Sequence, residues 1–247
     1  MPKIGDTTEM ENFKLPGNFG FSAAKIDTLG SSEYTLISLA VDDSGSIQGF
    51  VSEMVSCIKE IVAACRYSPR ADNLMIRLTT FADRLDEKHG FKPLSSINAD
   101  DYNSVLGHGG GTALYDACVN AIESTAAYGK SLSDQDFSAN GIAIFITDGQ
   151  DNSSAYNPAR VKDAIAALMK NEHLESMLTI LVAVNMNDQR SAAELQRFQT
   201  EAGLTQFINI TDANKSSLAK LAAFVSKSIS AQSSALGSGG PSQSITF

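Results

Sequence analysis

Hydrophobic positions along the chain fall into two alternating patterns. Apolar runs of strand length occur at 34–41, 73–81, 90–94, 141–147, 177–184 and 206–210. Segments with apolar residues at helical spacing lie between them at 47–66, 113–128, 158–170, 191–202 and 214–230. Strands that alternate with helices in this way predict an α/β domain with a mostly parallel sheet and helices on both faces.

The order of the strands follows from the same pattern. The run at 34–41 (YTLISLAV) is apolar almost throughout, which is typical of a central strand covered on both faces. The short run at 90–94 follows the run at 73–81 after a charged turn at 83–88, and we expect the two to pair. We predict a doubly wound, Rossmann-like sheet of six strands in the order 3-2-1-4-5-6, numbered along the chain.

The two ends of the chain lack this periodicity. Residues 1–32 mix Gly, Pro, Thr and Ser with Phe13, Phe19 and Phe21, and we interpret them as an N-terminal extension that packs its aromatic rings on the domain. Residues 231–247 are rich in Ser and Gly and are expected to form a flexible tail. The predicted domain therefore spans 33–230.

Composition narrows the classes of function. The chain has 247 residues, of which 43% are hydrophobic and 19% charged, as in ordinary globular proteins. Lys and Arg number 19 against 28 Asp and Glu, a net charge of −9, and we find no basic patch, so nucleic acid is not an expected partner. Cys57, Cys65 and Cys118 lie in apolar helical segments without a CxxC motif and are expected to be reduced core thiols.

The sequence also predicts the location of the protein. No apolar run approaches the roughly 18 residues that a membrane span requires. Residues 1–11 are polar and acidic and lack the apolar centre of a signal peptide. We therefore expect a cytoplasmic protein without a membrane anchor.

Oxygen-bearing side chains gather in three places that follow strands or precede a helix. Asp42, Ser44 and Ser46 alternate in the turn DDSGS, Thr112 ends the Gly-rich stretch GHGGGT, and Asp148 lies in ITDGQD. Asp42 and Asp148 end the first and fourth strands, which flank the switch point of the predicted strand order, where ligands of open α/β sheets bind. Two carboxylates and three hydroxyls without His or Cys suit Mg²⁺ or Mn²⁺ ahead of Ca²⁺.

Each of these features also has a simpler interpretation. The turn around Ser44 is compatible with a helix N-cap before Ile47, and Thr112 is compatible with a cap of the following helix. Asp43, between the ligands, is expected to point away from them. His108 is interpreted as an exposed loop residue, with contact to a partner as the alternative. A solvated turn is the expected role of Asp151 and Asn152, with hydrogen bonds that support the ligands as the alternative.

The three motifs together resemble a von Willebrand factor type A domain with a metal-ion-dependent adhesion site (MIDAS). The family signature is DxSxS after the first strand, a Thr in a Gly-rich loop and an Asp in a TDG turn, here Asp42, Ser44, Ser46, Thr112 and Asp148. The resemblance covers about 33–230. It implies a doubly wound sheet with one antiparallel edge strand, which suits 90–94, and those five residues as metal ligands. It also implies cation-dependent binding of a protein partner, often through the partner's Asp or Glu.

Two kinds of function are compatible with this site. The first is a non-enzymatic protein-binding module, as in intracellular relatives that serve as adaptors beside AAA+ ATPases or in stress-response and defence complexes. The alternative is a metal-dependent hydrolase or phosphotransferase that uses the same acidic site. Asp-nucleophile phosphatases resemble DxDx[TV] at this point, however, and Ser44 stands where their second Asp would be. The sequence leaves the oligomeric state open.

Overall fold

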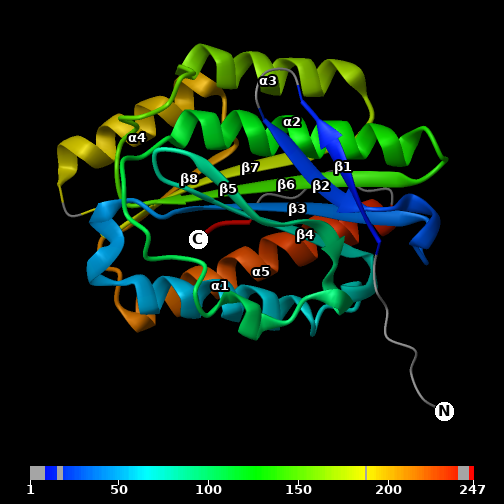
Figure 1. Cartoon of the computed structure of the whole chain (residues 1–247), viewed down its shortest axis with the longest axis horizontal. Helices are drawn as coiled ribbons and strands as arrows, with labels where there is room; N and C mark the ends of the chain where they lie inside the picture. Colours follow the sequence, from blue (N-terminus) through cyan, green and yellow to red (C-terminus); the bar gives the residue numbers. More distant parts are fainter. Residues whose placement is uncertain (1–8, 16–18, 187, 239–244) are drawn as a thin grey trace.

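The predicted alternation of strands and helices folds into a central sheet between two layers of helices (Figure 1). The computed structural model describes residues 9–15, 19–186, 188–238 and 245–247. The strands are β1 (Met10–Lys14), β2 (Gly20–Ala24), β3 (Glu33–Asp42), β4 (Leu74–Phe81), β5 (Leu85–Pro93), β6 (Ser138–Thr147), β7 (Met177–Val184) and β8 (Gln206–Ile210). The α-helices are α1 (Val51–Cys65), α2 (Leu114–Ser133), α3 (Pro158–Asn171), α4 (Gln189–Ala202) and α5 (Lys215–Ser238).

The sheet is mixed, with a parallel centre. Its strands are ordered β1-β2-β5-β4-β3-β6-β7-β8. β3 has the parallel neighbours β4 and β6, and β7 and β8 continue the parallel part. β5 runs antiparallel to β4, and β1 runs antiparallel to β2. The mostly parallel α/β sheet predicted from the sequence is confirmed.

The predicted number of strands and the predicted edge are wrong. In the described part of the chain the sheet has eight strands, because the N-terminal extension adds β1 and β2, so β5 lies between β2 and β4 and is not an edge strand. Gly90 permits this contact, since a Cβ there would lie 1.8 Å from the carbonyl oxygen of Ser22. β5 also begins inside the predicted charged turn, because Glu87 accepts a hydrogen bond from Arg77 Nε at 2.6 Å within the sheet.

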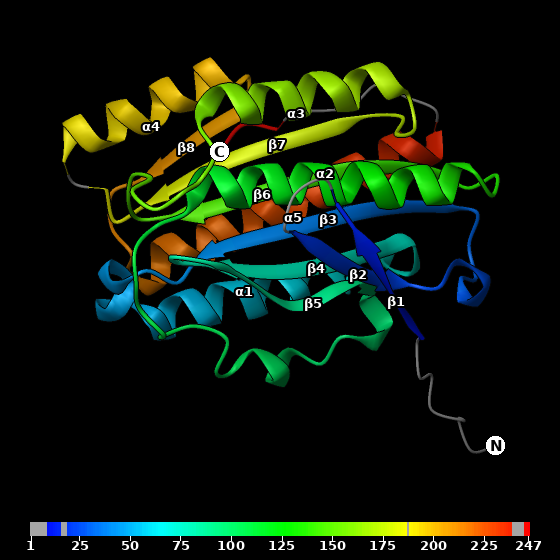
Figure 2. The same ribbon diagram turned by 45° about the horizontal axis from the view of Figure 1, so that its top comes forward.

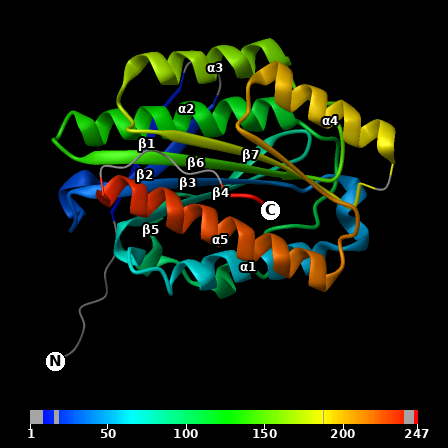
Figure 3. The same ribbon diagram turned by 180° about the vertical axis from the view of Figure 1, so that it is seen from behind.

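Helices cover both faces of the sheet, as predicted (Figures 2 and 3). Side chains of β3 alternate between the two layers: Ile37 and Leu39 pack with α1 and α5, whereas Ala40 packs with α2, α3 and α4. β3 is thus buried on both sides, which explains its almost continuous apolar sequence. Within the described residues, no helix combines the length and the apolarity needed to cross a membrane.

The aromatic side chains of the N-terminal extension pack on the domain, as predicted. Phe13 stacks on Phe21 with ring centroids 4.8 Å apart, and Phe21 meets Phe91 of β5 edge to face at 6.2 Å. Phe19 contacts Tyr156 at 6.1 Å. These ring contacts attach the hairpin β1–β2 to the domain, although the spacing of the rings in the sequence shows no regular period.

The predicted flexible tail is wrong for 231–238, which continue α5. The Ser-rich composition conceals a buried face: Gln232 and Ser233 are inaccessible to solvent, and Gln232 Nε2 donates to Ser176 Oγ at 2.8 Å. Residues 239–244 of the predicted tail lie outside the described residues. Beyond them, Ile245 accepts a hydrogen bond from Gln206, and Phe247 contacts the ring of Phe224 at 5.4 Å.

Candidate metal centre

The two predicted carboxylate ligands lie at the carboxyl ends of neighbouring parallel strands. The register of β3 and β6 pairs Val41 with Ile146, so Asp42 and Thr147 come side by side at the same edge. Thr147 Oγ1 donates to Asp42 Oδ2 at 2.6 Å, and Asp42 Oδ1 accepts from the backbone N–H of Ser44 at 2.8 Å. Asp42 is fully buried, and Asp148 follows directly after Thr147.

Hydroxyl groups join the two carboxylates into one network. The Oγ atoms of Ser44 and Ser46 lie 2.9 Å apart, and Ser46 Oγ donates to Asp148 Oδ1 at 2.7 Å. Four of the five predicted ligands, Asp42, Ser44, Ser46 and Asp148, are therefore linked by hydrogen bonds. Ser44 precedes the short 3₁₀-helix Gly45–Gly49, but its side chain makes no capping hydrogen bond, which counts against the helix-cap interpretation.

Thr112, the fifth predicted ligand, reaches the same place on a different loop. The backbone N–H of Gly45 donates to the carbonyl of Gly110 at 3.0 Å, which holds the Gly-rich loop against the DxSxS turn. Thr112 Oγ1 lies 3.9 Å from where a Cβ of Gly149 would be. Among the described residues, its hydroxyl makes no hydrogen bond to the other four. Ala113, not Thr112, is the N-cap residue of α2, so the predicted cap is absent.

Acidic and amide side chains fix these loops to one another, and for Asp151 and Asn152 such hydrogen bonds are the alternative to the expected solvated turn. Asn152 Oδ1 accepts from the N–H of Thr112 at 2.8 Å, and Asp151 accepts from the N–H of Tyr115 at 3.0 Å. Asp116 accepts from the N–H groups of residues 155 and 156. Asp151 is therefore a loop anchor, not a merely solvated turn residue. Its closeness in sequence to Asp148 was the available signal.

The carboxyl groups of Asp42 and Asp148 are harder to ionise than they would be in water. Burial raises the pKa of Asp42 to about 6, and the charge of Asp148 adds to the effect of burial. Burial also raises the pKa of Asp148 above its usual range. Among the described residues, none of the ion pairs includes Asp42 or Asp148. Within the described part of the chain, these two neighbouring carboxylates therefore have no ion-pair partner.

The donor set fits a hard divalent cation. In the described part of the chain, no three His, Cys, Asp or Glu side chains are grouped as a metal site. The arrangement seen here has two carboxylates and three hydroxyls, and oxygen donors of this kind suit Mg²⁺ or Mn²⁺ more than soft transition metals. The site offers the oxygen donors that such an ion prefers, and its two carboxylates have no ion-pair partner among the described residues. The residues present therefore fit a hard divalent cation.

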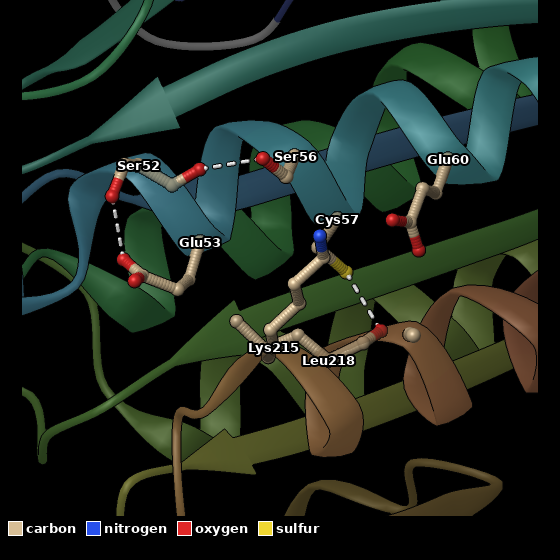
Figure 4. A pocket seen from close by; sticks show the side chains of 8 residues that line it. Ser52, Glu53, Ser56, Cys57, Glu60, Lys215 and Leu218 are labelled. Atoms are coloured by element: carbon tan, nitrogen blue, oxygen red, sulfur yellow. Dashed lines mark hydrogen bonds between the residues drawn. The ribbon is translucent and has the colours of Figure 1, made fainter.

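A pocket between α1 and α5 differs from the candidate metal centre in its chemistry (Figure 4). It measures about 140 Å³ and is lined by Ser52, Glu53, Ser56, Cys57, Glu60, Lys215, Leu218 and Ala219. The thiol of Cys57 donates to the carbonyl of Leu218 at 3.5 Å, and burial raises the pKa of this thiol to about 12. A thiol that stays protonated at neutral pH is a poor nucleophile. The described cysteines are all free and buried, as predicted.

The sequence of the chain matches one known family of protein domains. The model of the von Willebrand factor type A (VWA) domain family matches residues 37–223. The chain belongs to this family. No curated protein sequence matches it significantly.

Solved structures share the VWA fold at low sequence identity. The PilB minor pilin from Streptococcus sanguinis is 12% identical with a TM-score of 0.61, covering 89% of this chain and 66% of the pilin. The pilus adhesin SpaC from Lactobacillus rhamnosus GG, in its open conformation, is 11% identical with a TM-score of 0.57, covering 93% of this chain and 35% of SpaC.

A third structure has a metal in the corresponding motif. Proximal thread matrix protein 1 from the mussel byssus is described with a zinc-occupied MIDAS motif. It is 19% identical with a TM-score of 0.53, and the match covers 79% of this chain and 46% of the byssus protein. The VWA chain thus spans between about one third and two thirds of the length of these three proteins. At such identities the likeness shows the fold alone.

Proposed function

We propose that this VWA chain is a non-enzymatic protein-binding module that depends on a divalent cation. Asp42, Ser44, Ser46, Thr112 and Asp148 would hold Mg²⁺ or Mn²⁺, and a protein partner would contribute an Asp or Glu carboxylate. The observation that carries the proposal is the buried Asp42 carboxylate, which is linked through Ser44 and Ser46 to Asp148 and forms no ion pair with a described residue.

The residues account for how such a site would act. When bound, the ion supplies a positive centre that attracts an outside oxygen ligand. Ser44, Ser46 and Thr112 contribute neutral oxygens, so the two carboxylates offset no more than the charge of the ion itself. Thr147 fixes the second oxygen of Asp42, which leaves the carboxylate one preferred orientation. These groups are on loops held by a rigid sheet edge, where α/β proteins bind their ligands.

The family supports the proposal at a coarser level. VWA domains often mediate protein–protein interaction, and a structural neighbour is described with zinc in its MIDAS. For this chain, the hard oxygen donors favour Mg²⁺ or Mn²⁺ over zinc. The cytoplasmic adaptor role, beside an AAA+ ATPase or in a stress-response or defence complex, belongs to the same proposal and rests on the resemblance to intracellular relatives.

Direct titration tests the metal site. Isothermal titration of the metal-free chain with Mn²⁺ and Mg²⁺ should show one saturable site in the wild type, and Asp42→Ala should weaken binding at least about 100-fold, because a charged ligand is lost. Asp212→Asn is the matched control, since Asp212 is exposed and follows β8 at the same edge of the sheet. Equal affinity of the wild type and Asp42→Ala would contradict the proposed site.

Capture from the native cell extract tests the binding function. Partners should be retained by the wild type with Mg²⁺ and lost with EDTA or with Asp42→Ala. If every captured partner is indifferent to both, the metal-bridged interaction is wrong. Turnover of a generic phosphoester that Asp42→Asn abolishes would instead support the hydrolase alternative.

A further inference from the structure

Asp43, next to the proposed ligand Asp42, holds the Gly-rich loop rather than facing the metal site. Its Oδ1 accepts hydrogen bonds from the backbone N–H groups of Gly107 at 2.6 Å and His108 at 3.1 Å. Its Oδ2 lies 2.6 Å from His108 Nδ1. One carboxylate thus receives three hydrogen bonds from two consecutive residues. We call Asp43 and these donors the Asp43 clamp.

The loop that the clamp holds needs external support. Gly107, Gly109 and Gly110 all have positive φ angles, of 107°, 79° and 124°. Glycines gain this freedom at the cost of a large conformational entropy, so the loop by itself specifies no single path. Thr112 lies four residues beyond His108 in the sequence, at the end of this flexible stretch.

The clamp is anchored at a rigid point of the fold. The side chain of Asp43 is 5% exposed, and its backbone N–H donates to the carbonyl of Phe81, the last residue of β4, at 2.8 Å. The backbone N–H of Gly45 reaches Gly110 from the same turn. The segment 42–46 therefore carries three of the proposed ligands, and it also holds the loop that carries the third hydroxyl ligand, that of Thr112.

His108 forms the outer half of the clamp. Its side chain is 59% exposed, in line with the predicted exposed loop position, yet its ring is bound to Asp43. An ionised carboxylate accepts hydrogen bonds only, so Nδ1 donates and the ring orientation is fixed. Side chains that orient a metal ligand from outside typically change metal affinity by about 10- to 100-fold when removed.

We propose that Asp43 is a positioning residue that places Thr112 for metal binding by clamping the loop at Gly107 and His108. This inference rests on the proposed function, because it assumes that Thr112 is a ligand of the same site. It assigns a role to two residues, Asp43 and His108, that the metal motif itself does not include.

A double-mutant cycle tests the clamp, with Mn²⁺ as the probe in isothermal titration. Asp43→Ala should weaken Mn²⁺ binding about tenfold. If Asp43 acts through Thr112, the effects should not multiply: Asp43→Ala combined with Thr112→Ala should bind about as weakly as the weaker single variant. His108→Ala, which keeps both backbone hydrogen bonds, should lose about threefold. Asp212→Asn, with the same charge change, should match the wild type.

The possible outcomes distinguish a failure of the Asp43 clamp from a failure of the proposed metal site. Unchanged Mn²⁺ affinity in Asp43→Ala, or effects of Asp43→Ala and Thr112→Ala that multiply, would overturn the clamp while leaving the metal site intact. Absence of Mn²⁺ binding in the wild type, or equal binding by Asp42→Ala, would overturn both proposals.

Folding of the variants is checked by circular dichroism in EDTA. Should Asp43→Ala fail to fold, Asp43→Asn replaces it, since an amide oxygen still accepts from both backbone N–H groups while the charge of the carboxylate is lost and the contact to the ring has to reverse its direction. The expected loss is then about threefold, and it should again not multiply with Thr112→Ala. A folded Asp43→Asn protein whose loss multiplies with that of Thr112→Ala would overturn the inference.

Discussion

Two polar clusters, one around Arg77 in β4 and one at the end of β3, differ in their balance of charge. Arg77 of β4, 1% exposed, donates to Glu87 at 2.6 Å, to Asn120 at 2.9 Å and to Ser124 at 3.2 Å. Glu87 in turn accepts from the N–H and hydroxyl of Ser22. In this cluster one positive charge meets one negative charge. At the end of β3, Asp42 is connected to Asp148 through Ser44 and Ser46, and neither carboxylate forms an ion pair with a described residue.

The difference separates a structural cluster from a binding site. The Arg77–Glu87 pair is complete within the chain, and through Ser22 it ties the N-terminal hairpin to the sheet. Burial lowers the pKa of Arg77, and the charge of Glu87 opposes this effect. The Asp42–Asp148 cluster is incomplete, and burial raises both carboxyl pKa values. A buried charge that the protein does not neutralise needs an ion from solution or a proton.

Removing the negative charge from the complete cluster should have the largest effect on stability. Glu87→Gln leaves Arg77 buried without a counter-charge, and we expect a loss of about 3 to 5 kcal/mol in the free energy of unfolding. The loss should be the same with Mg²⁺ and with EDTA, because the cluster takes no ion. Urea unfolding followed by circular dichroism measures both values.

The matched control for this variant lies one residue away. Asp86 is exposed and pairs with Lys88, so Asp86→Asn should cost less than about 1 kcal/mol. A similar loss for the two variants, or a loss for Glu87→Gln that depends on Mg²⁺, would break the distinction between the clusters.

Removing a charge from the incomplete cluster should have the opposite sign. Asp42→Asn keeps the shape of the side chain and an acceptor for the N–H of Ser44, but it needs no counter-charge. In EDTA at pH 7 we expect the free energy of unfolding to rise by about 3 kcal/mol, the cost of ionising a carboxyl whose pKa is about 6 instead of its ordinary 3.8. Mg²⁺ should stabilise the wild type and leave the variant unchanged in thermal unfolding.

The pH dependence sharpens this prediction. Because the folded-state pKa of Asp42 is raised, the metal-free folded wild type holds its proton more tightly than the unfolded chain does. Its stability relative to Asp42→Asn should therefore be greatest below about pH 4 and fall as the pH rises through about 6. A difference between the two proteins that stays constant from pH 4 to 7 in EDTA would contradict a buried, uncompensated Asp42.

A smaller effect is expected where the loops of the incomplete cluster pack closely. A Cβ at Gly111 would lie 2.0 Å from Ser153 Oγ and 2.7 Å from both Asn152 Oδ1 and Asp83 Oδ1. Gly111→Ala should cost about 1 to 3 kcal/mol and reduce the stabilisation by Mg²⁺, because Thr112 is displaced. Gly49→Ala is the control, since a Cβ there meets nothing within 4 Å. Equal thermal stability of the two variants would show that the loops yield without cost.

Local sequence predicted the centre of the fold, and it predicted which strand ends carry the proposed ligands. The apolar run at 34–41 lies within β3, and the run at 141–147 forms the second part of β6. Because these strands are parallel neighbours, Asp42 and Asp148 come to the same edge of the sheet, where Ser44 and Ser46 connect them. Strand ends in a parallel sheet are set by short-range patterning, so their side chains could be placed in advance.

The pattern of hydrophobic and polar residues did not predict β1, β2 or the end of α5. The hairpin β1–β2 depends on Phe91 and on the absence of a side chain at Gly90, both distant in sequence. The helical continuation after residue 230 depends on contacts such as that of Gln232 with Ser176. Composition contains no information about such distant contacts, and both segments were therefore predicted to be irregular.

By itself, the sequence determined the α/β class, the two helical layers and the oxygen donors that follow the strands. Periodicity and residue type act over a few neighbouring positions, and both are visible in the chain. Only the tertiary structure decided that Thr147 orients Asp42, that Asp43 grips the loop before Thr112, and that Arg77 is neutralised while Asp42 is not. These outcomes depend on which distant groups meet and how far water is excluded, and both are properties of the folded chain.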